Sequence, residues 1–187
     1  MHLRELRLSG TYEIQLPFHS DHRGLFVKSF CRSAFASHGL EIDFSETFYT
    51  VSKENVIRGM HFQTPPHDHA KLVYCISGRV LDFALDLRVG SPSYGLFESL
   101  ELDSARFNAA YLPRGIAHGF AVLEAPAVMA YHVSSEHAPA ADSGVHWDSF
   151  GATWPSQATV VSNRDAGLLK FEEFVSPFVF SMRVPNS

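Results

Sequence analysis

The chain has little cysteine, no long apolar run and no excess of positive charge. Its two cysteines, Cys31 and Cys75, are too few and too far apart for a disulfide framework, and no metal-binding spacing joins them. No stretch approaches the roughly 18 consecutive apolar residues of a membrane span, and residues 1–6 lack the apolar core of a signal peptide. We therefore expect a cytosolic protein that makes no contact with a membrane.

Charge and composition narrow the class of partner. The formal net charge is −5 at pH 7, which provides no basic footprint for nucleic acid. The 187 residues are 45% hydrophobic and 13% aromatic, which is enough for one domain with a sizeable core. We expect a single domain over residues 1–187 with its core at about 21–165. Its partners should be small molecules or a second copy of the chain.

Strand signals dominate the sequence, and turn residues separate them at short intervals, which indicates an all-β sandwich or barrel. The expected strands are 10–16, 24–30, 44–51, 72–87, 97–102, 106–112, 120–123 and 127–133. Only 33–38 and the segment after Ser162 have a helical pattern. We therefore expect short helices in the N-terminal region and in a helical or extended C-terminal segment at 162–187.

Ser77 and Gly78 separate two apolar runs and are typical of a two-residue hairpin turn. Such a turn would pair Ile76 with Arg79 and assign every neighbouring side chain to one of two faces. One face would carry the polar side chains His69, Lys71, Asp82 and Asp86. The other face is uniformly apolar, so the polar face contacts either water or the lumen of a barrel.

The segment 58–66 sets an ionisable imidazole beside a cation in strand-like sequence. His61 lies close to Arg58 and Gln63, and Gly59 permits close approach of the backbone to a ligand. A lone histidine is more often structural, but an imidazole that titrates near neutrality suits acid–base catalysis. The cations and donors suited to the phosphates of a nucleotide-linked substrate are Arg23, Arg58, Lys71 and His118.

Two further side chains suit proton transfer. Tyr131 follows the apolar run 127–130 and is by default a core aromatic, yet its phenol can donate a proton while neutral at pH 7. Asp165 follows Ser162 and is typical of a helix cap. Alternatively, a buried carboxylate at this position could bind the His61 imidazole and raise its basicity. The sequence leaves both roles of Asp165 open.

A divalent metal is a second hypothesis. The segment 67–69, His-Asp-His, and the segment 113–118 resemble the two metal motifs of the cupin superfamily. No glutamate follows the first motif at the required distance, and Lys71 would repel a cation. We therefore expect no bound metal. A metal-dependent dioxygenase or isomerase using His67, His69 and His118 is the alternative function.

Seven ordered blocks resemble the dTDP-4-dehydrorhamnose 3,5-epimerase family of sugar-nucleotide enzymes. They are 21–26, 58–63, 71–73, 86–88, 91–95, 113–120 and 144–148. The resemblance implies a cupin-type jelly roll, or double-stranded β-helix, that acts as a homodimer without a metal or other cofactor. It also implies inversion at C5, C3 or both of a nucleotide-linked 4-keto-6-deoxy sugar, a hexose or a heptose, through an enolate.

The resemblance also implies roles for individual residues. His61 would be the general base, Asp165 its partner, Tyr131 the opposing acid and Lys71 the stabiliser of the enolate oxygen. Family positions that hold the nucleotide sugar match Arg23, Arg58, His118 and Asp142. We expect further substrate contacts from Lys28, Glu46, Phe48, Gln63, Asp82, His137 and Arg164.

Five of these positions depart from the family pattern. Glu46 and Phe48 replace a Gln-x-Asn pair that contacts the nucleotide, and Lys28 stands where a glutamate is usual. His137 replaces a tyrosine, and Arg164 replaces a lysine. Glu46 could accept from an amino-bearing base, which favours a GDP- or CDP-linked sugar over a dTDP-linked one, or it could pair with Lys28. A noncatalytic sugar-nucleotide binding protein is a further alternative.

Overall fold

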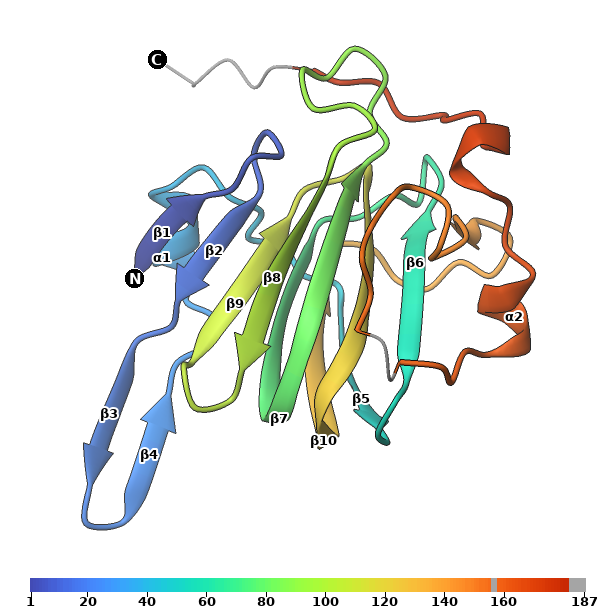
Figure 1. Ribbon diagram of the computed structural model, residues 1–187. Helices are drawn as coiled ribbons and strands as arrows, with labels where there is room; N and C mark the ends of the chain where they lie inside the picture. Colours follow the sequence, from blue (N-terminus) through green and yellow to red (C-terminus); the bar gives the residue numbers. More distant parts are fainter. Residues whose placement is uncertain (156–157, 182–187) are drawn as a thin grey trace.

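Strands form most of the regular structure of the protein, a computed structural model that describes residues 1–155 and 158–181 (Figure 1). The strands are β1 His2–Glu5, β2 Tyr12–Gln15, β3 Phe18–Asp21, β4 Gly24–Val27, β5 Glu46–Ser52, β6 Ile57–Gln63, β7 Lys71–Asp86, β8 Phe97–Asp103, β9 Asn108–Leu112, β10 Ile116–Val133 and β11 Asp142–Gly144. The helices are α1 Arg32–Ala36, α2 Asn163–Ala166 and a 3₁₀ turn at Phe171–Glu173. The last part of the expected C-terminal segment, 182–187, lies outside the described residues.

Two long antiparallel strands, β7 and β10, run through the centre of the fold and belong to two sheets at once. The first part of β7 pairs with β9, and its second part pairs with β8. In the same way, β10 pairs first with β6 and then with β5. The chain therefore forms two sheets that share their central strands, and the predicted all-β jelly roll is confirmed.

The predicted hairpin at Ser77 and Gly78 is wrong, because β7 continues through both residues. The register with β10 shifts here, so that Ser77 lies opposite Val128 and Arg79 lies opposite Glu124. Gly78 has a φ of +76°, and a Cβ at this position would lie 2.4 Å from the carbonyl oxygen of Glu124. Only glycine allows the two backbones this close. The turn signal marks a bulge at which the two long strands bend together.

The faces predicted for this segment are correct, because the bulge restores the alternation on its far side. Val73 and Cys75 precede the bulge, Val80 and Ala84 follow it, and all four join one buried cluster with Tyr131 of β10. This cluster fills the space between the two sheets. The long strands therefore present one continuous inner face.

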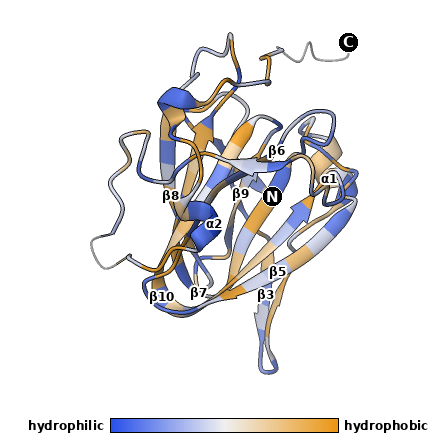
Figure 2. Ribbon diagram, turned by 90° about the vertical axis from the view of Figure 1, so that its right-hand side faces the viewer, coloured by the Kyte–Doolittle hydropathy of each residue, from blue (hydrophilic) through white to orange (hydrophobic). Residues whose placement is uncertain are grey.

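The outer faces of the sheets are covered by different parts of the chain. Phe35 of α1 packs over Leu72 of β7, and Phe178 of the C-terminal segment packs in the cluster that contains Phe83 and Leu85. Figure 2 shows hydrophobic residues along the strands and hydrophilic ones on α2. The uniformly apolar face predicted for β7 is thus covered on both sides of the bulge, except at Ile76, which is 56% exposed.

Charged side chains are also found on the inner face. Lys71 and Asp82 are only 7% and 2% exposed, so contact with water does not account for them and both side chains lie in the interior of the protein. Asp86 is fully buried and accepts hydrogen bonds from Arg88 and Ser91. Asp86 therefore anchors the loop that follows β7.

Two glycines bring β6 and β10 unusually close together. A Cβ on Gly59 would lie 2.4 Å from Cα of Gly119, and a Cβ on Gly119 would lie 2.7 Å from the carbonyl oxygen of Arg58. Two residues beyond Gly59, the register sets His61 opposite His118. The absence of both side chains therefore lets the two histidines lie on neighbouring strands.

The remaining features concern the surface and the thiols. β3 and β4 form a separate hairpin that projects from the body of the molecule (Figure 1). In the described residues, no helix is long and apolar enough to cross a membrane. Cys31 and Cys75 are both free, in agreement with the expectation that they form no disulfide.

Candidate active site

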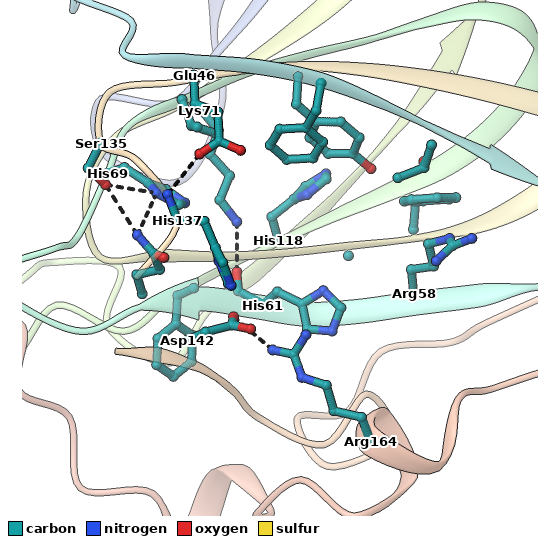
Figure 3. Close-up of a pocket in the computed structure, with 18 residues that line it drawn as sticks. Glu46, Arg58, His61, His69, Lys71, His118, Ser135, His137, Asp142 and Arg164 are labelled. Carbon is teal, nitrogen blue, oxygen red and sulfur yellow. Dashed lines mark hydrogen bonds and ion pairs between the residues drawn. The ribbon is translucent and has the colours of Figure 1, made fainter. Parts of the chain in front are cut away.

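A pocket of about 350 Å³ opens onto the inner face of the sheets (Figure 3). Its walls come mainly from β5, β6 and β10, with one residue each from β7, β11 and α2 and three loop residues, His69, Ser135 and His137. The predicted site residues that line it are Glu46, Phe48, Arg58, His61, Gln63, Lys71, His118, Tyr131, His137, Asp142 and Arg164. The volume is typical of a site for a small molecule.

His61 on β6 is paired with a carboxylate from α2. Its Nε2 lies 2.7 Å from Oδ1 of Asp165, whose other oxygen accepts the Gly59 backbone N–H at 3.1 Å. The hydroxyl of Ser162 caps α2 by accepting the backbone N–H of Asp165 at 3.1 Å. The cap residue is therefore Ser162, and of the two roles that the sequence leaves open Asp165 takes the second, because its carboxylate binds the imidazole.

The surroundings of Asp165 keep its carboxylate charged. Burial alone would raise its pKa, but hydrogen bonds from His61, Gly59 and Ser162 together hold the pKa below its usual range. A charged carboxylate accepts the Nε2 proton, so we assign the lone pair of the neutral imidazole to Nδ1. Among the described residues Nδ1 has no hydrogen-bond partner, which leaves it free to act as a base in the pocket.

Lys71 reaches across from β7 to the strand that carries His61. Its Nζ donates a hydrogen bond to the carbonyl oxygen of His61 at 2.9 Å (Figure 3). Burial lowers the pKa of Lys71 to about 8, although the charges of Asp82 and Asp142 oppose this shift. An ammonium group with so little water around it attracts an oxyanion more strongly than it would in bulk solvent.

Tyr131 on β10 lies between two other rings of the pocket. The ring of Phe48 is stacked on it with a centroid distance of 4.7 Å and an interplanar angle of 12°. His118 meets it edge-on at 5.9 Å and 72°. Burial raises the pKa of Tyr131, so its phenol remains protonated at neutral pH. A neutral proton donor and the His61 imidazole therefore line the same pocket.

Asp82 stands behind the pocket wall. Its Oδ1 lies 2.6 Å from Nε2 of His118, and both side chains are buried. Burial raises the pKa of Asp82, while the charges of His118 and Lys71 act in the opposite direction. Asp82 does not line the pocket itself, so its direct contact is with His118.

Gln63 forms hydrogen bonds with the loops at one end of the pocket. Its Nε2 lies 2.8–3.3 Å from the His67 carbonyl, the His69 Nδ1, the Ser135 hydroxyl and the Glu136 carbonyl. Its Oε1 accepts the backbone N–H of Ala138 at 2.7 Å. Burial, together with the charge of Lys71, lowers the pKa of His69 to about 3. His69 is therefore a neutral part of this wall.

The alternative of a metal held by His67, His69 and His118 does not fit this arrangement. No three potential ligands converge within residues 1–155 and 158–181. His67 is exposed and does not line the pocket, and Nε2 of His118 is held by Asp82. The donor set favours acid–base chemistry over this alternative.

The other predicted pocket residues differ in whether they already form ion pairs or hydrogen bonds within the protein. Arg164 pairs with Asp142 at 2.8 Å, and Glu46 accepts the backbone N–H of His137 at 2.7 Å. Arg58 forms no ion pair within the described chain, and its Nε donates only to a serine hydroxyl. The guanidinium of Arg58 is therefore available for an anion.

Besides Asp82, two residues predicted to contact the substrate, Arg23 and Lys28, lie outside the pocket. Arg23 is exposed at the turn between β3 and β4, where it pairs with Asp21 at 2.6 Å. Lys28 is exposed just after β4. The predicted alternative pair of Lys28 with Glu46 is not formed within the described part of the chain.

Thr50 and Ser135 line the pocket although the sequence did not single them out. Thr50 follows Phe48 by two residues on β5, so strand alternation sets both side chains on one face. This two-residue period could have identified Thr50 from the sequence. Ser135 lies in the loop after β10, where no periodicity applies.

The jelly roll and a pocket lined by a carboxylate-paired imidazole, a buried lysine and a buried phenol place the protein in the cupin class. The model of the dTDP-4-dehydrorhamnose 3,5-epimerase family matches residues 5–173. The chain therefore belongs to this family, and it is an isomerase.

Individual relatives agree with this assignment. A dTDP-4-dehydrorhamnose 3-epimerase of Streptomyces niveus is 36% identical over 176 residues, which cover 92% of this chain and 85% of that protein. A dTDP-4-dehydrorhamnose 3,5-epimerase of Mycolicibacterium smegmatis is 34% identical, with 89% and 84% covered. A crystal structure of the Legionella pneumophila 3,5-epimerase in complex with dTDP-4-keto-L-rhamnose has a TM-score of 0.92 and 26% identity, with 96% and 98% covered.

Replacing Lys71 with methionine should raise the free energy of unfolding at pH 7 by about 1–3 kcal/mol, because the buried ammonium is costly to keep charged. The full destabilisation by the buried, charged Lys71 is present below pH 8. It falls as the pH rises from about 8 toward the unfolded value of 10.5, because the folded lysine then loses its proton first. Urea unfolding from pH 6 to 10 should show the gap narrowing above pH 8.

The exposed Lys53 provides the matched control. Lys53→Met should change the free energy of unfolding by less than about 0.5 kcal/mol at every pH. A Lys71→Met variant that is less stable than the native protein at pH 7 would contradict the assigned cost of burial.

Proposed function

We propose that this isomerase inverts C5, C3 or both of a nucleotide-linked 4-keto-6-deoxyhexose by removing and returning a proton. The observation that carries the proposal is the pairing of His61 with Asp165 in a pocket that also holds the neutral phenol of Tyr131 and the desolvated Lys71. The names of the relatives support it, since they include a 3-epimerase and 3,5-epimerases. The Legionella pneumophila structure supports a nucleotide-linked 4-keto sugar as the ligand.

The chemistry suits these groups. A ketone at C4 acidifies the hydrogens on C3 and C5, and His61 would remove one of them through Nδ1. The electron pair moves into an enolate whose oxygen, O4, gains negative charge beside Lys71. Tyr131 would then protonate the carbon from the opposite face, and the carbonyl would form again. Inversion requires that the proton leaves from one face of the sugar and returns to the other, because a base that returned its own proton would regenerate the starting configuration.

His61→Ala should reduce the entry of solvent deuterium at C3 and C5 by about 10²–10⁴-fold, because the imidazole that Asp165 orients toward the pocket is lost. Nucleotide binding should change less than about threefold, since the imidazole faces the reacting carbon. NMR of a 4-keto sugar nucleotide incubated with the protein in deuterated water measures the exchange. His38→Ala, at an exposed histidine outside the pocket, is the control and should exchange normally. Unchanged exchange in His61→Ala would remove His61 from the role of base.

The nucleotide carrier is a second part of the proposal. Glu46 lines the pocket with a carboxylate, and one of its oxygens already accepts the His137 N–H. The other oxygen is an acceptor that would match the amino group of guanine or cytosine. We therefore infer a GDP- or CDP-linked substrate, in contrast to the dTDP in the names of the relatives.

Glu46→Gln should shift the ratio of kcat/KM toward the dTDP-linked substrate by about tenfold, because an amide replaces a charged acceptor. Steady-state rates with dTDP-, GDP- and CDP-linked 4-keto-6-deoxyhexoses measure the ratio. Glu54→Gln, at an exposed glutamate, is the control and should leave it unchanged. Comparable turnover of all three substrates by the native protein would rule out selection of the base by Glu46.

We also propose that the protein is a homodimer. Within the described chain β5 pairs only with β10, and it exposes Tyr49 and Val51, at 68% and 57%. The projecting hairpin exposes Phe26 at 63%. Exposed apolar residues on an unpaired strand edge and on a projecting hairpin are typical of an interface. Arg23 and Lys28 lie at this hairpin, so their expected contact with substrate requires a neighbouring copy.

Light scattering after size exclusion should give twice the chain mass of 20.8 kDa for the native protein. Phe26→Asp should reduce the mass to that of one chain, because a buried, unpaired carboxylate would destabilise the interface. Val175→Asp, at a residue that is 90% exposed elsewhere, is the control and should leave the mass unchanged. A native protein with the mass of one chain would contradict the dimer.

A further inference from the structure

The proposed acid, Tyr131, is held by the strand that faces it. The register of β5 and β10 sets Phe48 directly opposite Tyr131, and the two rings are stacked at 4.7 Å and 12°. Stacking on a directly opposed ring restricts rotation of the phenol out of its plane. The sequence assigned Phe48 to the nucleotide, whereas its contact in the structure is with the proton donor.

Thr50 approaches the same phenol from further along β5. It is two residues after Phe48, so both side chains are on the face that lines the pocket. Its Oγ1 is buried and has no hydrogen bond of good geometry among the described residues. A buried hydroxyl without a partner is costly and requires an explanation. The hydroxyl is near enough to Tyr131 to lower the pKa of the phenol, although burial has the larger and opposite effect.

We propose that Phe48 and Thr50 position Tyr131 for proton delivery, Phe48 by fixing the plane of the ring and Thr50 by donating a hydrogen bond to the phenolic oxygen as it loses its proton. This inference rests on the proposed epimerase function. The proton of Tyr131 passes to the enolate carbon, the electron pair of the enolate forms the new C–H bond, and the carbonyl at C4 returns. Negative charge then develops on the phenolic oxygen, where the Thr50 hydroxyl donates while keeping its own proton.

Thr50 acts through Tyr131 and not on the carbon that His61 deprotonates. Its removal should therefore spare the first proton transfer and impair the second. In deuterated water the two steps give different products. Proton removal followed by return to the same face gives substrate that contains deuterium without inversion, whereas delivery from the Tyr131 side gives inverted product. The ratio of inverted product to deuterated, uninverted substrate reports the second step alone.

The experiment compares four variants with the native protein by NMR in deuterated water. Thr50→Val, which keeps the shape and removes the hydroxyl, should lower the ratio about tenfold while total deuterium entry changes less than about twofold. Thr50→Ser should keep the ratio within about twofold. Tyr131→Phe should lower the ratio further than Thr50→Val. Phe48→Leu should lower it in the same direction, because the ring then loses its stacked neighbour.

Thr47→Val is the matched control, because Thr47 is on the same strand but its hydroxyl contacts His132 on the other face. It should leave the ratio unchanged. An unchanged ratio in Thr50→Val, or an equal loss of exchange and inversion, would overturn the role of Thr50. Deuterium entry that depends on His61 shows that each variant is folded. No exchange in the native protein would overturn the proposed function, and this inference with it. Normal exchange with an unaltered ratio in Thr50→Val would overturn this inference alone.

Discussion

The pocket depends on how closely β6 approaches β10. Gly59 and Gly119 lack the side chains that would keep the strands apart, and the backbone contact between them sets His61 opposite His118. The same part of β6 provides the N–H of Gly59 that holds Asp165, and the carbonyl that receives the Lys71 ammonium. One backbone contact therefore determines where the proposed base, its carboxylate and the cation lie relative to one another.

Around that contact the protein buries charges that would each be costly alone. Asp165 is compensated by three hydrogen bonds, and Asp82 by His118. Within the described residues, the one hydrogen-bond partner of the Lys71 ammonium is a carbonyl, and burial lowers its pKa. A cation that is incompletely satisfied in the resting pocket is better satisfied when an anion forms beside it. In the proposed reaction the site would thus favour the charge distribution of an enolate over that of the neutral ketone.

Local sequence signals predict the short helices and most of the longer strands, because alternation acts over a few residues, but they divide β10 in two and omit the short β1, β3 and β11. Pocket residues such as Asp142 and Arg164 are expected from the resemblance to the family. Local signals fail where the conformation or position of a residue depends on a segment that is distant in the sequence. Ser77 and Gly78 have the composition of a turn, and only the matching irregularity in β10 shows that they form a bulge. Arg23 belongs to a matching block, yet the β3–β4 hairpin carries it outside the pocket of its own chain. The contact of Asp165 with His61 spans 104 positions, which no local pattern reaches.

The position of Asp165 near the end of the chain has a consequence for biosynthesis. The sheets that form the pocket are complete in sequence by Val133, apart from the short β11, whereas the carboxylate that binds His61 belongs to a four-residue helix some thirty positions later. During synthesis on a ribosome the long strands therefore emerge while the imidazole still lacks its partner. The proposed base is paired with its carboxylate only when the segment around Ser162 has emerged and docked, so the site is completed after all the strands that form it have been synthesised.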